Sequence, residues 1–320
     1  MKLGVFTVLF GGQPFDKALD YIKKSGLEAV EIGVGSWPGS AHCPVDDLLA
    51  SKDKAAEYKR KITGRGLEIS ALSCHGNPLH PDPAFAKKEI EVMHKAFRLA
   101  EMLGVRTVIT FSGCPGGGPK DTTPNWVTCP WPPDFSDAVK WQWEKKLIPF
   151  WTKEAARAKK HGVQVAFEMH PGFCVYNTDT MLRIRRECGP TIGVNFDPSH
   201  LFWQGMDPLV SLKALGKGVF HVHAKDCRVD PQNTALTGVL DTKHYGDEMN
   251  RSWIFRTVGY GHGETFWRDF VSTLRMIGYD GVISIEHEDS LMSVNEGFQK
   301  AVAFLKRIIL TEKTGGMWWA

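Results

Sequence analysis

The sequence predicts an α/β fold of the (β/α)₈ TIM barrel class, formed as a single domain. Short β-rich runs alternate with longer helical patterns along the whole chain, and the 320 residues hold eight such units. Strict alternation of strand and helix favours right-handed crossovers and a parallel sheet. Eight units in a chain of this length indicate a sheet that closes on itself.

Eight runs are rich in the apolar and β-branched residues of buried parallel strands. The expected strands are 3–10, 29–35, 68–74, 107–113, 164–170, 192–197, 219–225 and 281–287. Helical patterns lie between them, at about 14–26, 45–65, 84–104, 136–161, 177–188, 207–215, 264–278 and 294–310. Glycine closes several helices, and the cluster Asn177-Thr178-Asp179 begins another. An open, doubly wound sheet would usually carry a G-x-G-x-x-G turn after its first strand, and FGGQPF is not one.

Two connections are too long to be simple turns. Residues 113–134 follow the fourth expected strand, and residues 226–263 follow the seventh. Both belong to the C-terminal face of the barrel, where long ordered loops build or cover active sites. We assign residues 1–312 to the barrel and residues 313–320, which end in GGMWWA, to a C-terminal tail of unassigned role.

The composition excludes several classes of partner. Lys and Arg number 39 against 36 Asp and Glu, and no run of five like charges occurs, so neither nucleic acid nor a membrane surface is expected as a partner. No segment approaches the roughly 18 uninterrupted apolar residues of a membrane helix. The seven cysteines are scattered without a C-x-x-C pair, which favours reduced thiols and a cytoplasmic location.

Four apolar runs in the second half of the chain end in residues that bind metals. They are Glu168, Asp197, His223 and Glu286. A single acid at a strand end often forms an ion pair, but in a barrel all strands open on the same mouth, so four such residues can converge on one cation. Three carboxylates and one imidazole suit one divalent ion, with Mn²⁺ preferred and Mg²⁺ or Co²⁺ as alternatives. Structural zinc is not expected, because no thiolate cluster accompanies the set.

The segments around these residues carry a family resemblance. They read FEMHPG (167–172), NFDPSH (195–200), HVHAKD (221–226) and IEHED (285–289). Over essentially its whole length the chain resembles the xylose isomerase-like superfamily, which contains ketose 3-epimerases, inosose isomerases and dehydratases, and endonuclease IV. The resemblance implies that the four residues bind one metal ion, that Glu168 and Glu286 also carry protons, and that His200 contacts substrate.

The predicted function is that of a divalent-metal-dependent isomerase or epimerase of a sugar, keto-sugar or cyclitol. The metal would stabilise an enediolate while Glu168 and Glu286 transfer a proton on opposite sides of one carbon. A lyase or dehydratase of keto-sugars or inososes would use the same proton abstraction and is the alternative. The run HAKDCR (223–228) favours keto-sugar or inosose substrates. A homo-oligomer is left open.

Seven residues are predicted to contact the small-molecule substrate. His75 and Glu31 are expected at the mouth, after strands three and two. Lys225 and Asp226 match the H-x-K-D of inosose-processing members, and Arg228 is expected to hold a hydroxyl or phosphate. The full substrate set is His200, His75, Glu31, His170, Lys225, Asp226 and Arg228.

The sequence disfavours two rival functions. The three-metal site of endonuclease IV needs further histidines, but the fourth strand here ends in TFSG (110–113), and Trp253 and Phe255 stand where that enzyme has Asp and His. The near-neutral charge also lacks the basic surface expected of a DNA-binding protein. A non-catalytic sugar-binding barrel is disfavoured because all four metal-binding residues are present.

Overall fold

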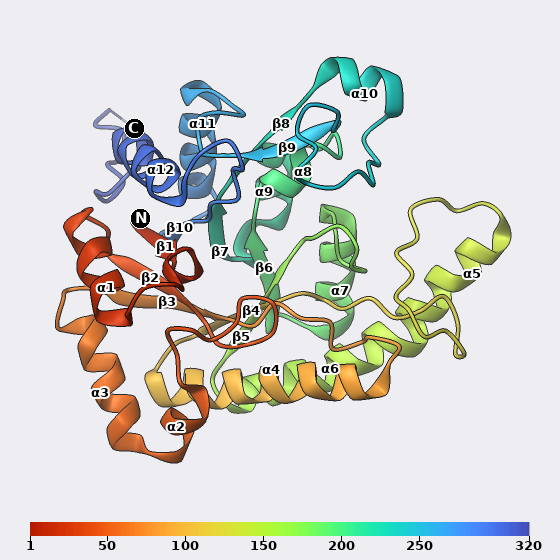
Figure 1. Ribbon diagram of the computed structural model, residues 1–320, viewed down its shortest axis with the longest axis horizontal. Helices are drawn as coiled ribbons and strands as arrows, with labels where there is room; N and C mark the ends of the chain where they lie inside the picture. Colours follow the sequence, from red (N-terminus) through yellow and green to blue (C-terminus); the bar gives the residue numbers. More distant parts are fainter. Residues whose placement is uncertain (320) are drawn as a thin grey trace.

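Eight parallel strands close into a barrel in the computed structural model, which describes residues 1–319 (Figure 1). The order around the barrel is β1-β10-β7-β6-β5-β4-β3-β2, and β1 closes the ring by pairing with both β10 and β2. This confirms the predicted fold class. The barrel strands are β1 (Lys2–Phe6), β2 (Ala29–Gly33), β3 (Glu68–Ser73), β4 (Thr107–Thr110), β5 (Gln164–Glu168), β6 (Ile192–Phe196), β7 (Val219–Ala224) and β10 (Val282–Ile285).

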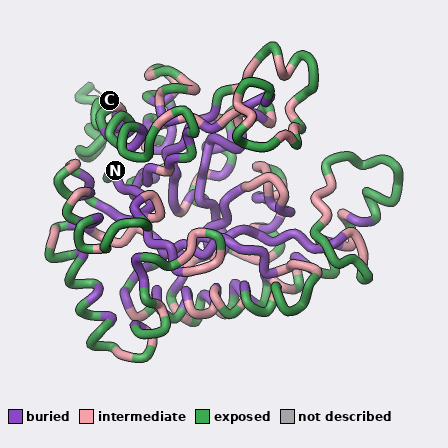
Figure 2. The backbone as a smooth tube through the Cα atoms, in the orientation of Figure 1, coloured by how far each residue is buried: buried purple, intermediate pink, exposed green. Residues whose placement is uncertain are grey.

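Helices surround the barrel with their outer faces exposed and their inner faces buried (Figure 2). Trp151 and Trp267 are fully buried in the core that joins helices and strands. The helices are α1 (Phe15–Lys24), α2 (Val45–Ala50), α3 (Lys52–Thr63), α4 (Pro83–Leu103), α5 (Pro133–Trp141), α6 (Ile148–Lys160), α7 (Thr178–Cys188), α8 (Ser199–Phe202), α9 (Pro208–Leu215), α10 (Pro231–Thr237), α11 (Glu264–Met276) and α12 (Val294–Ile308).

Side-chain caps explain several of the helix starts. Asp82 accepts hydrogen bonds from the first turn of α4, and Asn177 forms a capping box with Thr180 at the start of α7. Ser51 caps α3 by accepting from the backbone N–H of Lys54, so the single helix predicted over 45–65 is divided in two. The helix predicted over 136–161 is one continuous run, α5 and α6 joined by the π-helical turn η2 (Gln142–Leu147).

Apolar residues fill the barrel interior toward the N-terminal ends of the strands. Ala71, Ile109 and Ala166 form a buried cluster there with Phe220 packed against it. A Cβ at Gly193 would collide with the ring of Phe220, so glycine is needed at that position. Above this apolar layer the interior becomes polar, and that polar layer carries the candidate site.

The long connection after β7 contains structure that the sequence pattern did not predict. Strand β8 (Asp226–Val229) pairs antiparallel with β9 (Trp253–Arg256), and α10 lies between them in sequence. This hairpin projects from the barrel beside α8, as Figure 1 shows.

The sequence-based domain and location assignments remain predictions. These are the boundary between the barrel, 1–312, and the tail, 313–320, and the cytoplasmic location. Ala320, the end of the predicted tail, lies outside the described residues. Among the residues that the structure describes, no helix combines the length and the apolar character needed to cross a membrane.

Candidate metal centre

The four predicted metal-binding residues lie together at the C-terminal end of the barrel. Glu168 ends β5, Asp197 and Glu286 directly follow β6 and β10, and His223 is the fifth residue of β7. Each offers one ligand atom, and these atoms all lie within 4.8 Å of one another. Two ligands bound at about 2.1 Å to one ion are at most about 4.2 Å apart, so only small side-chain movements are needed to bind a shared cation.

Two carboxylate oxygens in this group lack a hydrogen-bond partner. Asp197 accepts from the backbone N–H of Ser199 through Oδ1, whereas its buried Oδ2 has no hydrogen bond within residues 1–319. Glu286 Oε2 is likewise buried without one, although it lies 2.9 Å from Nδ1 of His223. Leaving a buried polar atom unsatisfied costs about 1–3 kcal/mol. The residues present therefore fit a divalent cation that would satisfy both oxygens.

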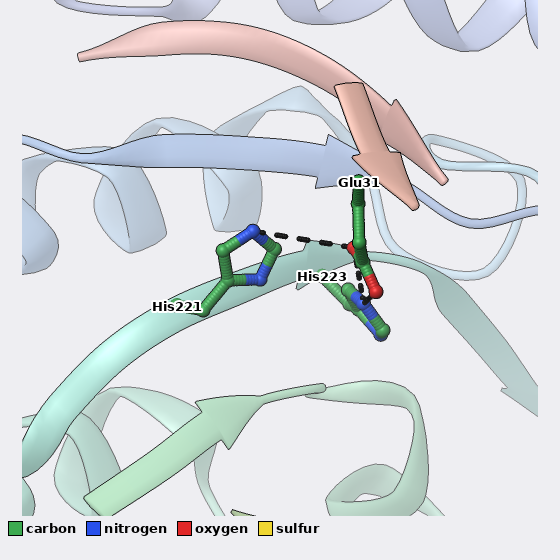
Figure 3. Close-up of side chains that lie close together, drawn as sticks. All are labelled: Glu31, His221 and His223. Atoms are coloured by element: carbon green, nitrogen blue, oxygen red, sulfur yellow. Dashed lines mark hydrogen bonds and ion pairs between the residues drawn. The ribbon is translucent and has the colours of Figure 1, made fainter. Parts of the chain in front are cut away.

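Glu31 lies on the other side of the His223 ring from the centre. Its Oε2 is 2.9 Å from His223 Nε2, and it accepts hydrogen bonds from Ser73 (2.6 Å) and Ser284 (2.8 Å). Figure 3 shows Glu31 between His223 and His221, whose Nε2 is 4.0 Å away. The prediction that placed Glu31 at the mouth was wrong. The residue is fully buried because β2 continues to Gly33 and the carboxylate points into the barrel.

The pKa values of this pair follow from their mutual contact. Burial alone would raise the pKa of Glu31, but His223 outweighs it and holds that pKa below the usual value. Burial lowers the pKa of His223, whereas Glu31 and Glu286 raise it well above the ordinary value. The charges of Glu31 and His223 are therefore stabilised by each other and by Glu286.

Glu168 is held by groups from three neighbouring strands and loops. His75 Nε2 lies 3.1 Å from its Oε2, and His200 Nε2 lies 3.2 Å from its Oε1. Asn195 donates to Oε2 at 3.0 Å. Burial would raise the pKa of Glu168, but His75, His200 and His223 keep it well below the usual value. His75 and His200 therefore lie at the candidate metal centre, where both contact the Glu168 carboxylate.

Asn195 was not singled out from the sequence. It lies two residues before Asp197 on the same inward face of β6, and its Oδ1 is 2.9 Å from Nδ1 of His221. His221 in turn lies 3.1 Å from Ser70 Oγ through Nε2. The period of two along a strand was the available signal, because residues 195 and 197 share a side of the sheet.

Lys225 brings a buried positive charge next to the carboxylates. Its Nζ lies 2.6 Å from Glu288, 3.5 Å from Glu286 and 3.6 Å from Asp197. Burial lowers the pKa of Lys225, but these acids raise it well above the ordinary value. His170 is nearby, its ring 4.2 Å from that of His200, and burial with that neighbour lowers its pKa to about 3. His170 is therefore a neutral imidazole.

Two residues of the predicted substrate set have other surroundings in the structure. Asp226 is fully buried and accepts hydrogen bonds from the backbone N–H groups of Gly259, Gly261 and His262 and from the Trp267 indole, so its oxygens are occupied by its own loop. A Cβ at Gly261 would collide with Asp226. Arg228 is exposed on β8 opposite Ile254, and within the described chain it lines neither cavity at the mouth.

A cavity of about 550 Å³ lies over the centre. Its polar lining comes from Glu168, Glu286, Lys225, Glu288, His75 and His170. An aromatic wall, which the sequence did not predict, completes the lining. In that wall Phe111 stacks on Phe173 with centroids 4.3 Å apart, and Trp37 contacts both rings while remaining 60% exposed. A cavity with an apolar wall and a few converging polar groups is typical of a small-molecule site.

A family model described as "Xylose isomerase-like TIM barrel" matches residues 19–308 of the chain. The chain is 39% identical over 312 residues to the uncharacterized protein YfiH of Bacillus subtilis, covering 97% of this chain and 99% of YfiH. It is 26% identical over 286 residues to the rhizopine catabolism protein MocC of Rhizobium meliloti, covering 88% and 76%.

Solved structures show the same fold. The IolI protein with a bound zinc atom has a TM-score of 0.65 at 19% identity, covering 97% of this chain and 98% of IolI. The 3-keto-D-glucoside 4-epimerase YcjR of E. coli has a TM-score of 0.65 at 15% identity, covering 96% and 99%. At these identities the likeness concerns the fold alone.

Proposed function

The chain belongs to the xylose isomerase-like TIM barrel family, and on that premise we propose that it is a divalent-metal-dependent isomerase or epimerase of a sugar, keto-sugar or cyclitol. One observation carries the proposal. Three carboxylates and His223 converge beside a cavity that Glu168 and Glu286 line, with unsatisfied oxygens on Asp197 and Glu286. The sugar epimerase named among the structures of the same fold is consistent with this activity.

Glu168, Asp197, His223 and Glu286 would hold the cation. The zinc atom in the IolI structure supports a divalent ion in this fold. The oxygen-rich ligand set leads us to propose Mn²⁺ first, with Mg²⁺ or Co²⁺ as alternatives. When bound, such an ion supplies Lewis-acid stabilisation of the negative charge that develops on a carbonyl oxygen during removal of a neighbouring C–H proton.

Glu168 and Glu286 are the proposed proton carriers. They end β5 and follow β10, and both line the cavity. Burial would raise the pKa of Glu286, but Lys225 and His223 lower it to about 2, so the carboxyl group is ionised at neutral pH. His75 and His200 hold the Glu168 carboxylate in one orientation. Lys225 and His170 face the same space and would contact substrate hydroxyls.

Exchange with solvent deuterium tests the proposal. The Mn²⁺-loaded protein is incubated in D₂O with a panel of keto-sugars and inososes, and NMR follows incorporation at each carbon. We expect deuterium at one carbon next to a carbonyl, loss of exchange after chelation, and recovery with Mn²⁺ or Co²⁺. Full activity of the metal-free protein would contradict the proposal.

A dehydratase is the second candidate. Inosose dehydratases occur among the more distant relatives. The inosose dehydratase of Lacticaseibacillus casei is 24% identical to this chain over 172 residues, which cover 51% of this chain and 52% of the relative. The same two glutamates would remove the proton, but a hydroxyl group would then leave. The NMR spectra separate the two functions, because a dehydratase product lacks that hydroxyl.

A further inference from the structure

A second cavity of about 380 Å³ adjoins the cavity over the metal centre. The two share His170 and Glu288 in their linings, so one molecule can extend from one into the other. The rest of the second lining comes from the hairpin connection and the segment after β10, namely Tyr245, Ile254, Phe255 and Ser290. The first cavity alone falls in the range of about 300–1,000 Å³ that small-molecule ligands occupy. The second therefore offers space for an additional group.

An aromatic platform forms one side of this second cavity. The Tyr245 ring lies nearly parallel to that of Phe255, with centroids 5.9 Å apart and an interplanar angle of 15°. Tyr245 is 56% exposed, yet its position is set by Arg251, whose guanidinium lies 4.4 Å from its ring and 4.6 Å from that of Trp253. An exposed ring that is held in place costs little ordering entropy on binding.

Arg251 is itself fixed within the protein. It is buried, donates to the Trp253 carbonyl through Nε at 3.1 Å, and donates to the carbonyl of Lys243. A cation between two aromatic faces is stabilised by the quadrupoles of both rings. Arg251 therefore holds the Tyr245 ring in place without lining the cavity itself.

Polar groups also line the second cavity. The Glu288 carboxylate is half-exposed, with one oxygen 2.6 Å from Lys225 Nζ, and Ser290 lies two residues further along. Lys225 is also 3.5 Å from Glu286, so the second cavity begins within a few contacts of a proposed metal ligand. The Phe255 ring carries the Lys225 ammonium 4.3 Å from its centroid, which leaves the exposed Tyr245 ring for a ligand. An aromatic face accepts the electropositive C–H face of a sugar ring, while a carboxylate accepts hydrogen bonds from its hydroxyls.

We propose that the second cavity is a subsite for a second sugar ring, and that the substrate is a keto-glycoside. The inference rests on the proposed function, since it assigns the substrate class of the same site. The proposal places the non-reducing ring over the metal centre, joined through its anomeric oxygen to the ring in the second cavity. A ring substituted in this way cannot open to free its anomeric carbonyl. The carbonyl that activates the neighbouring C–H must therefore lie on another ring carbon, as in a sugar oxidised at a secondary hydroxyl.

Calorimetric binding to the Mn²⁺-loaded protein tests the subsite without requiring turnover. The probes are methyl 3-keto-glucopyranoside and the disaccharides maltose and cellobiose oxidised at C3 of the non-reducing ring, which cover both anomeric linkages. At least one disaccharide is expected to bind 10-fold or more tightly than the methyl glycoside of the same anomeric configuration. Equal dissociation constants for all the matched pairs would overturn the proposal.

Variants of residues in the second cavity test whether it causes the preference for disaccharides. The ratio of the dissociation constants of the methyl glycoside and the disaccharide is expected to fall toward one in Tyr245→Ala and in Ser290→Trp, which fills the cavity. Tyr245→Phe, which keeps the ring, is expected to retain the ratio. The control Tyr260→Ala removes an exposed tyrosine that lines neither cavity. An unchanged ratio in both Tyr245→Ala and Ser290→Trp would place the second ring elsewhere and refute the subsite.

Deuterium exchange on the same samples separates the two proposals. Exchange into the methyl 3-keto-glycoside without any disaccharide preference would reject the subsite and leave the proposed function standing. A disaccharide preference that Tyr245→Ala abolishes, without exchange into any probe, would support the subsite and count against the proposed chemistry.

Discussion

Glu31 Oε2 and His223 Nε2 lie 2.9 Å apart inside the barrel, while Nδ1 of the same imidazole lies 2.9 Å from Glu286. Ser73 and Ser284 donate to the Glu31 carboxylate and hold it in place. A carboxylate that accepts a hydrogen bond from one ring N–H of a metal-binding histidine fixes the tautomer and ring orientation and increases the basicity of the other nitrogen. Glu31 therefore prepares His223 to bind a cation through Nδ1.

The first prediction concerns this positioning role. Glu31→Gln keeps the shape of the side chain and removes its charge, and we expect it to weaken Mn²⁺ binding by about 10–100-fold. Titration calorimetry on the metal-free protein measures the change directly, without an assay for turnover. Glu28→Gln, which alters an exposed residue just before β2, is the matched control. Wild-type affinity in Glu31→Gln would show that the contact does not tune the metal site.

The proposed proton transfer predicts that Glu168→Gln and Glu286→Gln each lower kcat by at least about 100-fold on the true substrate, because a positioned acid or base contributes that much. An amide can still bind a metal weakly but cannot accept a proton. Metal content, measured on the same samples, separates loss of the cation from loss of proton transfer. Near-normal rates in either variant would refute the two-glutamate scheme.

Asp226 is expected to matter for stability. Asp226→Ala leaves the buried indole N–H of Trp267 and three part-buried backbone N–H groups without this acceptor. The buried donor alone costs about 1–3 kcal/mol, so we expect the free energy of unfolding to fall by at least that amount. Urea denaturation measures the loss, with the exposed Asp269→Asn as control. If Asp226 instead serves only the substrate, the variant would keep wild-type stability and show a raised KM.

The barrel and the four converging side chains were predictable because they follow from simple patterns. Each apolar run predicts a strand, and the polar residue at its end predicts a side chain at the C-terminal face of the barrel. Closure of the barrel brings these strand ends together. The partners inside the barrel are harder to predict. Glu31 meets His223 across 192 residues of sequence, and no local period indicates which inward-facing side chains touch.

The corrections have a common physical cause. Asp226 lies two residues after the end of β7, where a contact with substrate was expected, but it is the first residue of β8 and its carboxylate faces the glycine-rich segment at 259–262. The hairpin of β8 and β9 pairs short segments separated by a long connection, so neither strand stands out by composition. The aromatic wall joins residues from three separate loops, which only the folded chain brings together.

Asp289 predicts a pH dependence of stability. Burial would raise its pKa, but the Thr257 N–H at 2.8 Å and Arg256 at 3.0 Å lower it below the unfolded-state value of about 3.9. Because the folded-state pKa is the lower one, this stabilisation is complete above pH 4 and is lost as the pH falls through the folded-state pKa.

Urea midpoints measured from pH 6 down to pH 2.5 test that sign. We expect the stability difference between the wild type and Asp289→Asn to be constant at the upper end and to shrink as the pH falls. The exposed Asp137→Asn serves as control and should show no such change. A difference that grows on acidification would contradict the assigned direction of the pKa shift.

Crystals soaked in Mn²⁺ and measured near the manganese absorption edge test the central claim most directly. One anomalous peak per chain is predicted, at about 2.0–2.3 Å from one oxygen each of Glu168, Asp197 and Glu286 and from Nδ1 of His223. An ordered Mn²⁺ bound elsewhere, or a chain that takes up no ion at this position at saturating concentration, would contradict it.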